Sequence, residues 1–294
     1  MATRDTDVFE AARPGLLGLA YRILGSRADA EDAIQDTYLK WSAADREDIV
    51  NPAAWLTTVC TRKCLDMRRA ADRRRVDYVG AWLPEPIHTI AEGGAEAEHM
   101  LASSLSTAFL LMLERLTPKE RAAYLLHEIF EMSYPDIAEA LELNETNCRK
   151  LVSRARDHVE RSRVRHVTPP ERQDQLLDAF QDAIMSGSAA RLTSLLSEDI
   201  RVVADSGGKA VAIRRALHGV EEVAAFLSQG LHRHWSGLEW ERTDLNGGRG
   251  LLIRMDGTTV AAVSFGYDQA GRLHDIFIVR NPDKLARTAA VAVQ

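Results

Sequence analysis

The chain has 294 residues, 46% of them hydrophobic and 27% charged, which predicts an ordinary soluble protein of two or three small domains. No apolar run is long enough to span a bilayer and MATRDTDVFE lacks an apolar signal core, so we expect a cytoplasmic protein with no membrane contact. The net charge of −6 is unusual for a protein that binds DNA alone, but arginines cluster at 62–75 and 149–165 while acids dominate 29–48, which fits a DNA reader within a larger machine.

An acidic helix is predicted first. Gly25-Ser26 ends one helix, and Ser26 stands where the N-cap of the next helix belongs. Asp29, Asp32 and Asp36 follow at i, i+3 and i+7, so their carboxylates share one face. In a lone helix such a face is usually a solvated stripe.

The following helix is basic. Asn51 is a plausible N-cap with Pro52 at the first helical position, and the helix runs into a cluster of cations that suits phosphate contacts. The cations include Arg62, Lys63, Arg68 and Arg69. Cys60 and Cys64 are i, i+4 neighbours, and without a Cys-His set at zinc spacing we predict two packed thiols and no metal.

A helix-turn-helix is predicted after an acidic connector. Residues 79–98 contain prolines, glycines and the sequence WLPEP, in which Trp82 either acts as part of a docking peptide or covers a gap. Thr117-Pro118 and Ser133-Tyr134-Pro135 then open two helices, and Asn144 caps a third, basic one. The outward side chains of this third helix should meet the major groove and the phosphates. They include Thr146, Asn147, Arg149, Lys150, Ser153 and Arg154.

A different pattern follows Thr168-Pro169-Pro170. Amphipathic helices are predicted at 172–186 and 189–196, and a further helix at 220–228. Strand-like stretches are predicted at 200–204, 211–217, 238–243, 250–254, 259–267 and 273–279. Helices followed by a curved antiparallel sheet suggest an α+β cone with a pocket at its open end.

The sequences DAEDAIQDTYLKW and NPAAWLTTVCTRKCLDMRR resemble region 2 of bacterial extracytoplasmic-function sigma factors. The resemblance implies that Asp29, Asp32, Gln35 and Asp36 dock on the clamp of the RNA polymerase β′ subunit. It also implies that the loop 42–50 and Asn51 capture unstacked bases of the minus-ten element, helped by the basic residues Arg62, Lys63, Arg68 and Arg69. The helix-turn-helix resembles region 4, which reads the minus-thirty-five element.

The last part of the chain resembles a SnoaL-like domain, and three tags link it to sigma factors that carry such an extension, the sigma J-like group. The tags are WLPEP (Trp82, Leu83, Pro84), DSGGK (Asp205, Lys209), in which Ser206 replaces a usual glycine, and NPDKL (Asn281, Pro282, Asp283, Lys284). The resemblance implies that this domain regulates polymerase engagement. It implies two partners, core polymerase (β′ clamp and β flap) and promoter DNA, with no cofactor and no obligatory separate anti-sigma factor.

The expected architecture is therefore two all-α sigma domains followed by an α+β cone. The expected boundaries are region 2 at 1–78, a linker at 79–100, region 4 at 101–165, a linker at 166–171, the SnoaL-like domain at 172–285 and a tail at 286–294.

Two alternatives remain open at this level. The last domain could bind a small molecule or catalyse a reaction, with His232, His234, Asp205 or the pair His274-Asp275 as acid–base groups. We expect no catalysis, because adjacent residues of a strand point to opposite faces, so His274 and Asp275 should not pair. The helix-turn-helix could also belong to a stand-alone dimeric regulator, although such a protein has no use for the acidic Asp29–Asp36 face.

Overall fold

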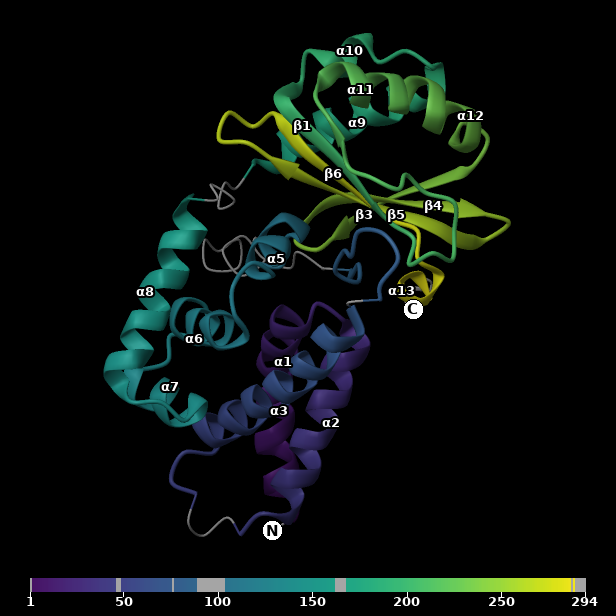
Figure 1. The fold of residues 1–294 in the computed structure, drawn as a ribbon. Helices are drawn as coiled ribbons and strands as arrows, with labels where there is room; N and C mark the ends of the chain where they lie inside the picture. Colours follow the sequence, from purple (N-terminus) through teal and green to yellow (C-terminus); the bar gives the residue numbers. More distant parts are fainter. Residues whose placement is uncertain are drawn as a thin grey trace. The chain divides into compact units, whose positions relative to one another are not determined.

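The computed structural model describes residues 2–45, 49–75, 77–88, 104–161, 168–286 and 288, with side chains in these ranges except those of 2–6, 72, 74 and 75. The chain forms two compact units (Figure 1). The helical unit combines Met1–Asp77 with Met112–Arg161, and the sheet unit combines Tyr78–Leu111 with Ser162–Gln294. Parts of the predicted loop 42–50, both linkers and the tail lie outside the described residues.

Three long helices begin the helical unit: α1 (Ala2–Leu24), α2 (Arg27–Ala43) and α3 (Pro52–Arg75). The predicted caps are confirmed, since Ser26 Oγ accepts from the Asp29 amide at 3.2 Å and Asn51 Oδ1 accepts from the Ala54 amide at 3.2 Å. The three helices pack against one another around buried apolar side chains such as Leu19. Two chain breaks encoded by local capping chemistry therefore produce the bundle.

Buried thiols lie on the inner side of α3. Cys60 Sγ and Cys64 Sγ are 4.0 Å apart, and both residues are fully buried. Burial and the contact with Cys60 raise the pKa of Cys64 well above its ordinary value. No cluster of metal-ligating side chains occurs among the described residues, so the predicted pair of packed thiols is confirmed.

The helix-turn-helix consists of α6 (Pro118–Glu128), α7 (Tyr134–Leu141) and α8 (Glu145–Arg161). Thr117 and Glu120 form the expected reciprocal capping box, and Asn144 Oδ1 accepts from the Asn147 amide at 2.8 Å. The inner face of α8 is apolar and buried. It consists of Cys148, Val152, Ala155 and Val159.

The sheet unit contains a mixed six-stranded sheet. In chain order its strands are β1 (Leu196–Asp205), β2 (Leu217–His218), β3 (Glu239–Leu245), β4 (Gly248–Met255), β5 (Thr258–Tyr267) and β6 (Leu273–Val279). Their spatial order is β2-β1-β6-β5-β4-β3. The predicted purely antiparallel sheet is wrong, because β1 and β6 pair in parallel. The other pairs are antiparallel, as successive strands joined by short turns must be.

The strand predicted at 211–217 is also wrong over most of its length. Only Leu217 and His218 pair with β1, and residues 206–216 form an irregular segment. Val211 is 84% exposed, so this segment gains little from burying its apolar residues against the sheet.

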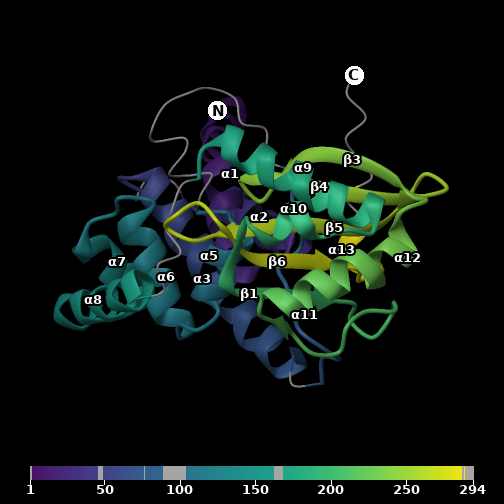
Figure 2. The same cartoon turned by 90° about the horizontal axis from the view of Figure 1, so that it is seen from above.

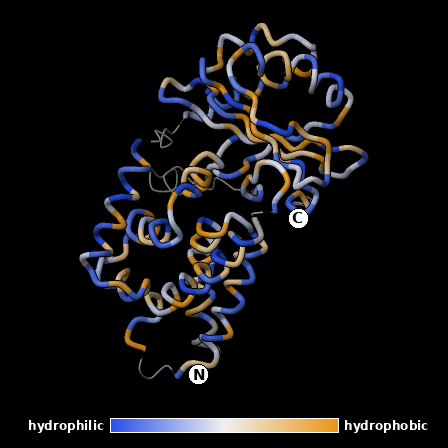
Figure 3. The backbone as a smooth tube through the Cα atoms, in the orientation of Figure 1, coloured by the Kyte–Doolittle hydropathy of each residue, from blue (hydrophilic) through white to orange (hydrophobic). Residues whose placement is uncertain are grey.

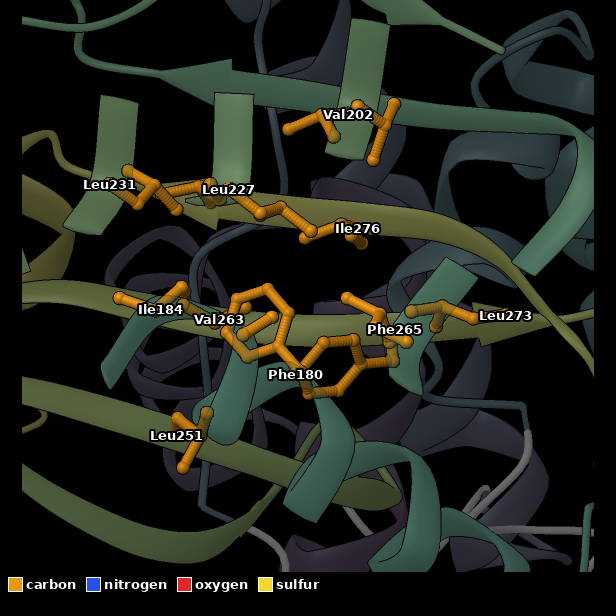
Figure 4. Close-up of a cluster of buried hydrophobic side chains, with 14 of the residues drawn as sticks. Phe180, Ile184, Val202, Leu227, Leu231, Leu251, Val263, Phe265, Leu273 and Ile276 are labelled. Atoms are coloured by element: carbon orange, nitrogen blue, oxygen red, sulfur yellow. The ribbon is translucent and has the colours of Figure 1, made fainter. Parts of the chain in front are cut away.

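Helices cover one face of the sheet, as Figures 1 and 2 show. They are α9 (Pro170–Ser186), α10 (Ala190–Thr193), α11 (Val220–Ala225), a π-helical turn (Phe226–Leu231) and α12 (His232–Trp235). Phe180 of α9 meets Phe265 of β5 edge to face at 5.2 Å, and Leu251 and Ile276 complete this core (Figure 4). The space between sheet and helices is a packed apolar core.

A second, smaller core lies on the opposite face. It joins Leu83 of the WLPEP segment, Leu245, Phe277 and Leu285. α5 (Thr107–Leu113) and α13 (Pro282–Leu285) flank this face, and the strands carry the hydrophobic stretches that both cores need (Figure 3). No helix of the described residues is both long and apolar enough to cross a membrane.

Candidate functional site

The acidic face of α2 is accessible. Asp32 and Gln35 are exposed, while Asp29 and Asp36 are half-buried. Asp36 forms an ion pair with Lys63 of α3, so one predicted polymerase contact and one predicted DNA contact are paired with each other. The helix itself needs none of these side chains for its core, which is built from Ala30, Ala33, Ile34, Thr37 and Trp41.

The start of α3 presents the residues expected to handle single-stranded DNA. Asn51 is exposed but acts as the N-cap. The half-buried Trp55 packs against the buried Trp41 with ring centroids 5.6 Å apart, so its ring is partly occupied by the core. Arg69 is exposed and pairs with Asp66 of the same helix at 3.3 Å.

Arg62 does not point freely to solvent. Its Nε donates to Ala140 O at 3.0 Å and its Nη2 to Glu139 O at 2.8 Å, and Nη1 lies 3.7 Å from Glu142 Oε1. These groups end α7, where helix carbonyls lack partners and carry partial negative charge. A residue predicted to contact DNA therefore caps the first helix of the helix-turn-helix.

Arg68 corrects a sequence prediction. It was expected to contact the melted strand, but its side chain is only 8% exposed and forms two bonds to Glu114, at 2.8 and 2.5 Å. A guanidinium held in this way inside the protein has no face left for a phosphate. The alternation of arginines along α3 gave no sign of this, because the partner lies far away in sequence.

The exposed face of α8 carries all six residues predicted to read duplex DNA. Arg149 pairs with Glu145 and lies over the Tyr134 ring, with its Cζ atom 4.2 Å from the centroid. Lys150 and Arg154 have no hydrogen-bond or ion-pair partner in the part of the chain that the structure describes. The exposed side chains are Thr146, Asn147, Arg149, Lys150, Ser153 and Arg154.

A groove of about 720 Å³ brings α3 and the helix-turn-helix together. Its rim is basic and its floor apolar, so it combines residues from both predicted DNA-reading segments. The lining residues are Leu65, Arg69, Thr117, Pro118, Lys119, Leu143, Asn147, Lys150, Leu151 and Arg154.

In the sheet unit the three tags meet at one buried carboxylate, that of Asp205, which is 0% exposed. Its oxygens accept from Tyr78 Oη at 2.5 Å, from the Leu83 amide at 2.9 Å and from Lys284 Nζ at 2.6 Å. Lys284 also donates to Leu83 O. We call this set, together with Asn281, the Asp205 hub, because every member contacts Asp205 or one of its partners.

Glycine makes the close approach in the hub possible. Gly207 has φ +56°, and a Cβ there would lie 2.5 Å from Asn281 Nδ2. Lys284 Nζ lies 4.4 Å from the centroid of the Trp82 ring, so the tryptophan covers the buried ion pair. Lys209 and Asp283 form a second, exposed ion pair. Pro84 is buried and Pro282 begins α13.

Sequence reasoning missed Tyr78. Its hydroxyl donates to Asp205 and accepts from Asn281 Nδ2 at 2.9 Å, and burial followed by the contact with Asp205 raises its pKa. The expected boundary had assigned residue 78 to region 2 and 79–100 to a linker. In the structure residues 78–88 pack within the sheet unit, and the tyrosine two residues before the glycine of VGAWLPEP was the available signal.

The prediction that His274 and Asp275 cannot pair is wrong, since His274 Nδ1 lies 2.7 Å from Asp275 Oδ2. Both neighbouring strands shift register here, between Leu196 and Arg201 on β1 and between Gly266 and Tyr267 on β5, so regular alternation fails. Asp275 also binds Arg201 Nε at 2.6 Å. The pair is thus part of an ion-pair network.

The other acid–base candidates are occupied or isolated. His232 Nδ1 bonds the Ile184 carbonyl at 2.7 Å, Asp205 belongs to the hub, and His234 is exposed. A polar cavity of about 310 Å³ lies between α9 and β3–β4, and it is lined largely by paired charges, among them Arg249 and Asp244. The structure does not assemble these histidines into one site.

Two family models match the chain. Sigma-70 region 2 matches residues 8–74, and Sigma-70 region 4 matches residues 106–159. These ranges cover α1 to α3 and the helix-turn-helix. The expected architecture, two helical sigma regions followed by a sheet-containing domain, is confirmed, and a stand-alone regulator is disfavoured.

Known proteins match most of the chain. The ECF RNA polymerase sigma factor SigJ of Mycobacterium tuberculosis is 37% identical over 240 residues, covering 80% of this chain and 75% of SigJ. The probable ECF sigma factor SigI of the same species is 30% identical over 78% of this chain and 76% of SigI. The crystal structure of SigJ from that species covers 98% of this chain and 100% of that chain, with a TM-score of 0.75 and 30% identity.

The expectation that no separate anti-sigma factor is needed must be corrected. The sigma factor RpoE of Bartonella quintana has been solved in complex with the anti-sigma factor NepR, so such sigma factors do take these partners. That chain is 23% identical, with a TM-score of 0.42 over 53% of this chain and 94% of its own, and at this level it assigns no partner here. The two region models and the relation to SigJ show that the chain belongs to the extracytoplasmic-function RNA polymerase sigma factors, in the group of SigJ, and serves promoter-specific transcription initiation.

Proposed function

We propose that the acidic face of α2 binds core RNA polymerase in the cytoplasm and that α8 and the start of α3 read the promoter. The observation that carries the proposal is the separation of charge on the helical unit. Asp32 and Gln35 are exposed on α2, while the cations of α8 form a continuous exposed face. Complementary charge speeds association and fixes orientation, and basic residues supply salt-dependent DNA affinity.

Within this proposal each segment has one task. Asn147 and Arg149 read base edges of the minus-thirty-five element in the major groove, and Lys150 with Arg154 contact phosphates. Asn51, Lys63 and Arg69 handle the minus-ten strand. Arg68 has a structural task, since Glu114 holds it inside the protein.

The polymerase contact can be tested by charge reversal. Asp32→Lys should weaken co-purification with core polymerase, because it places a cation in the acidic face, and it should not unfold the protein since Asp32 is exposed. Glu10→Lys on α1 is the control, as Glu10 is exposed on another helix and pairs only locally with Arg13. Equal binding of the wild type and Asp32→Lys would contradict the assignment of this face.

We also propose that the sheet unit regulates initiation without catalysing a reaction. The Asp205 hub supports this role, because it joins the connector before region 4 to the last helix of the described chain through buried charge. The packed core between sheet and helices and the scattered histidines argue against an active site there. No function for the polar 310 Å³ cavity is needed in this proposal.

Reconstituted run-off transcription tests the regulatory role. Lys284→Met keeps the length and apolar stem of the side chain and removes the charge that bonds Asp205 and Leu83 O. We expect the transcript yield to change relative to wild type. Lys209→Met, which removes only the exposed pair with Asp283, is the matched control. Unchanged yield in a folded Lys284→Met protein would refute a regulatory hub.

A further inference from the structure

Arginines of each sigma region cap helix ends of the other. The last carbonyls of α1 receive Arg121 Nε, bonded to Arg22 O at 2.8 Å, and Arg68 Nη1, 3.5 Å from Ile23 O. A helix C-terminus leaves its last carbonyls unpaired and carries partial negative charge, so guanidinium groups stabilise it. Since Arg121 lies on α6 and α1 belongs to region 2, this contact joins the two regions within the helical unit.

Glu114 closes this contact. Its Oε1 accepts from Arg68 Nη1 at 2.8 Å and Arg121 Nη1 at 2.7 Å, and its Oε2 from Arg68 Nη2 at 2.5 Å. The side chains of Arg121, Arg68 and Glu114 are 1%, 8% and 17% exposed. A carboxylate shared by two nearly buried guanidinium groups leaves two uncompensated charges when it is removed. We call Glu114, Arg68 and Arg121 the Glu114 clasp.

The second contact uses Arg62 of α3. Three of its nitrogens face the end of α7, at Glu139 O, Ala140 O and the Glu142 carboxylate. The guanidinium is a planar fork, so it cannot hold these groups and a DNA phosphate with the same nitrogens. The residue that would serve the promoter strand is therefore bound to the helix-turn-helix.

We propose that the Glu114 clasp and Arg62 hold the helical unit in a closed form, and that promoter DNA on core polymerase opens it by taking Arg62 from α7. This inference rests on the proposed DNA-binding role of α3. A ligand shifts such an equilibrium only by its difference in affinity for the two forms. DNA satisfies this condition because Arg62 is available to it only in the open form.

The closed form is encoded within the helical unit. Every residue of the clasp and of the Arg62 contact lies in Met1–Asp77 or Met112–Arg161. Substitutions in the Asp205 hub should therefore leave the closed form itself intact. This separates the present inference from regulation by the sheet unit.

Distance measurements between paired spin labels test the closed form in the full-length protein. Gly15→Cys on α1 and Asp157→Cys on α8 place the labels at exposed positions, and an added Cβ at Gly15 meets no atom within 4 Å. The three native cysteines are buried and should stay unlabelled. Wild type should give one dominant distance, with a second distance appearing when core polymerase and promoter DNA are added.

Two variants should populate the second distance without any ligand. Glu114→Gln removes the shared charge at nearly constant volume, and Arg62→Gln removes the contact with α7 from a side chain that is 44% exposed. We expect each to raise the ratio of open to closed forms at least tenfold. Arg69→Gln is the matched control, with the same charge change on the same helix, because its ion pair with Asp66 is local. It should leave the distances unchanged.

The outcomes separate this inference from the proposed function. If wild type keeps its single distance in the complex with polymerase and DNA, or if Arg62→Gln and folded Glu114→Gln keep it when free, the closed form does not control Arg62. Should Glu114→Gln fail to fold, Arg62→Gln decides alone, since its surface position does not threaten the core. A failure of the wild type to bind core polymerase would instead overturn the proposed function.

Discussion

Asp205 shows how strongly one side chain can organise the sheet unit. Asp205→Asn would leave Lys284, whose side chain is 13% exposed, without its counter-charge. Removing one partner of a buried pair costs roughly 3–5 kcal/mol, so we expect a loss of this order in the free energy of unfolding. Urea unfolding followed by near-ultraviolet circular dichroism measures it. Lys209→Met, at the exposed pair with Asp283, should cost only about 0–1 kcal/mol, and similar losses in both variants would contradict a buried hub.

His274 should make stability depend on pH. Its hydrogen bond to Asp275 raises its pKa, and Asp199 adds to this, while burial and Arg201 act in the opposite direction. Because the folded pKa is raised, the stabilisation is fully present below the unfolded pKa of about 6.5 and is lost as pH rises through the folded value. His274→Gln should therefore lose more unfolding free energy at pH 5.5 than at pH 8.5.

Unfolding in urea at both pH values checks this difference. His234→Gln is the control, since His234 is exposed and has no hydrogen-bond or ion-pair partner among the residues that the structure describes. A loss in His274→Gln that is the same at both pH values would show that the imidazolium–carboxylate contact does not stabilise the fold.

At the scale of elements, α8 should show two kinds of DNA contact. Asn147→Ala should cost about 1–3 kcal/mol on the native promoter and relax specificity at one base pair, because an amide reads a base edge. Lys150→Ala should weaken binding to all sequences and reduce the salt slope by about one, because it removes one phosphate contact. Titration of labelled promoter with the polymerase complex at several salt concentrations distinguishes them. Identical effects of the two variants on matched and mismatched promoters would contradict this division.

The sequence predicted elements best where the chemistry is local. Ser26, Asn51, Thr117 and Asn144 each bond a backbone amide three residues on, so the helix starts could be located without knowledge of the rest of the chain. The exposed face of α8 follows from the same reasoning. Contacts between distant segments behaved differently.

Arg68 shows the limit for candidate site residues. Nothing in the sequence around it separates it from Arg69, yet Arg68 is buried against Glu114 and Arg69 is exposed. Its fate depends on a carboxylate supplied by a segment more than forty residues away. The parallel pairing of β1 with β6 was missed for a similar reason, since hydrophobic pattern identifies a strand but not its neighbour.

At the scale of the whole molecule, the two units should unfold in separable steps. Each has its own buried core, with Leu19 and Leu56 in the helical unit and Phe180 and Phe265 in the sheet unit. We expect calorimetry to resolve two transitions, of which only one moves to lower temperature in Asp205→Asn. A single transition that shifts as a whole would show that the units are thermodynamically one.

The position of β6 has a consequence for how the protein is made. This strand comes last among the strands in the chain but occupies the place between β1 and β5 (Figure 1). A ribosome releases the N-terminal sigma regions early, whereas β1 cannot join the rest of the sheet until residues 273–279 have emerged. Lys284, which must reach Asp205, follows later still. Nascent and prematurely terminated chains therefore present promoter-reading helices before any control from the C-terminal fold can exist.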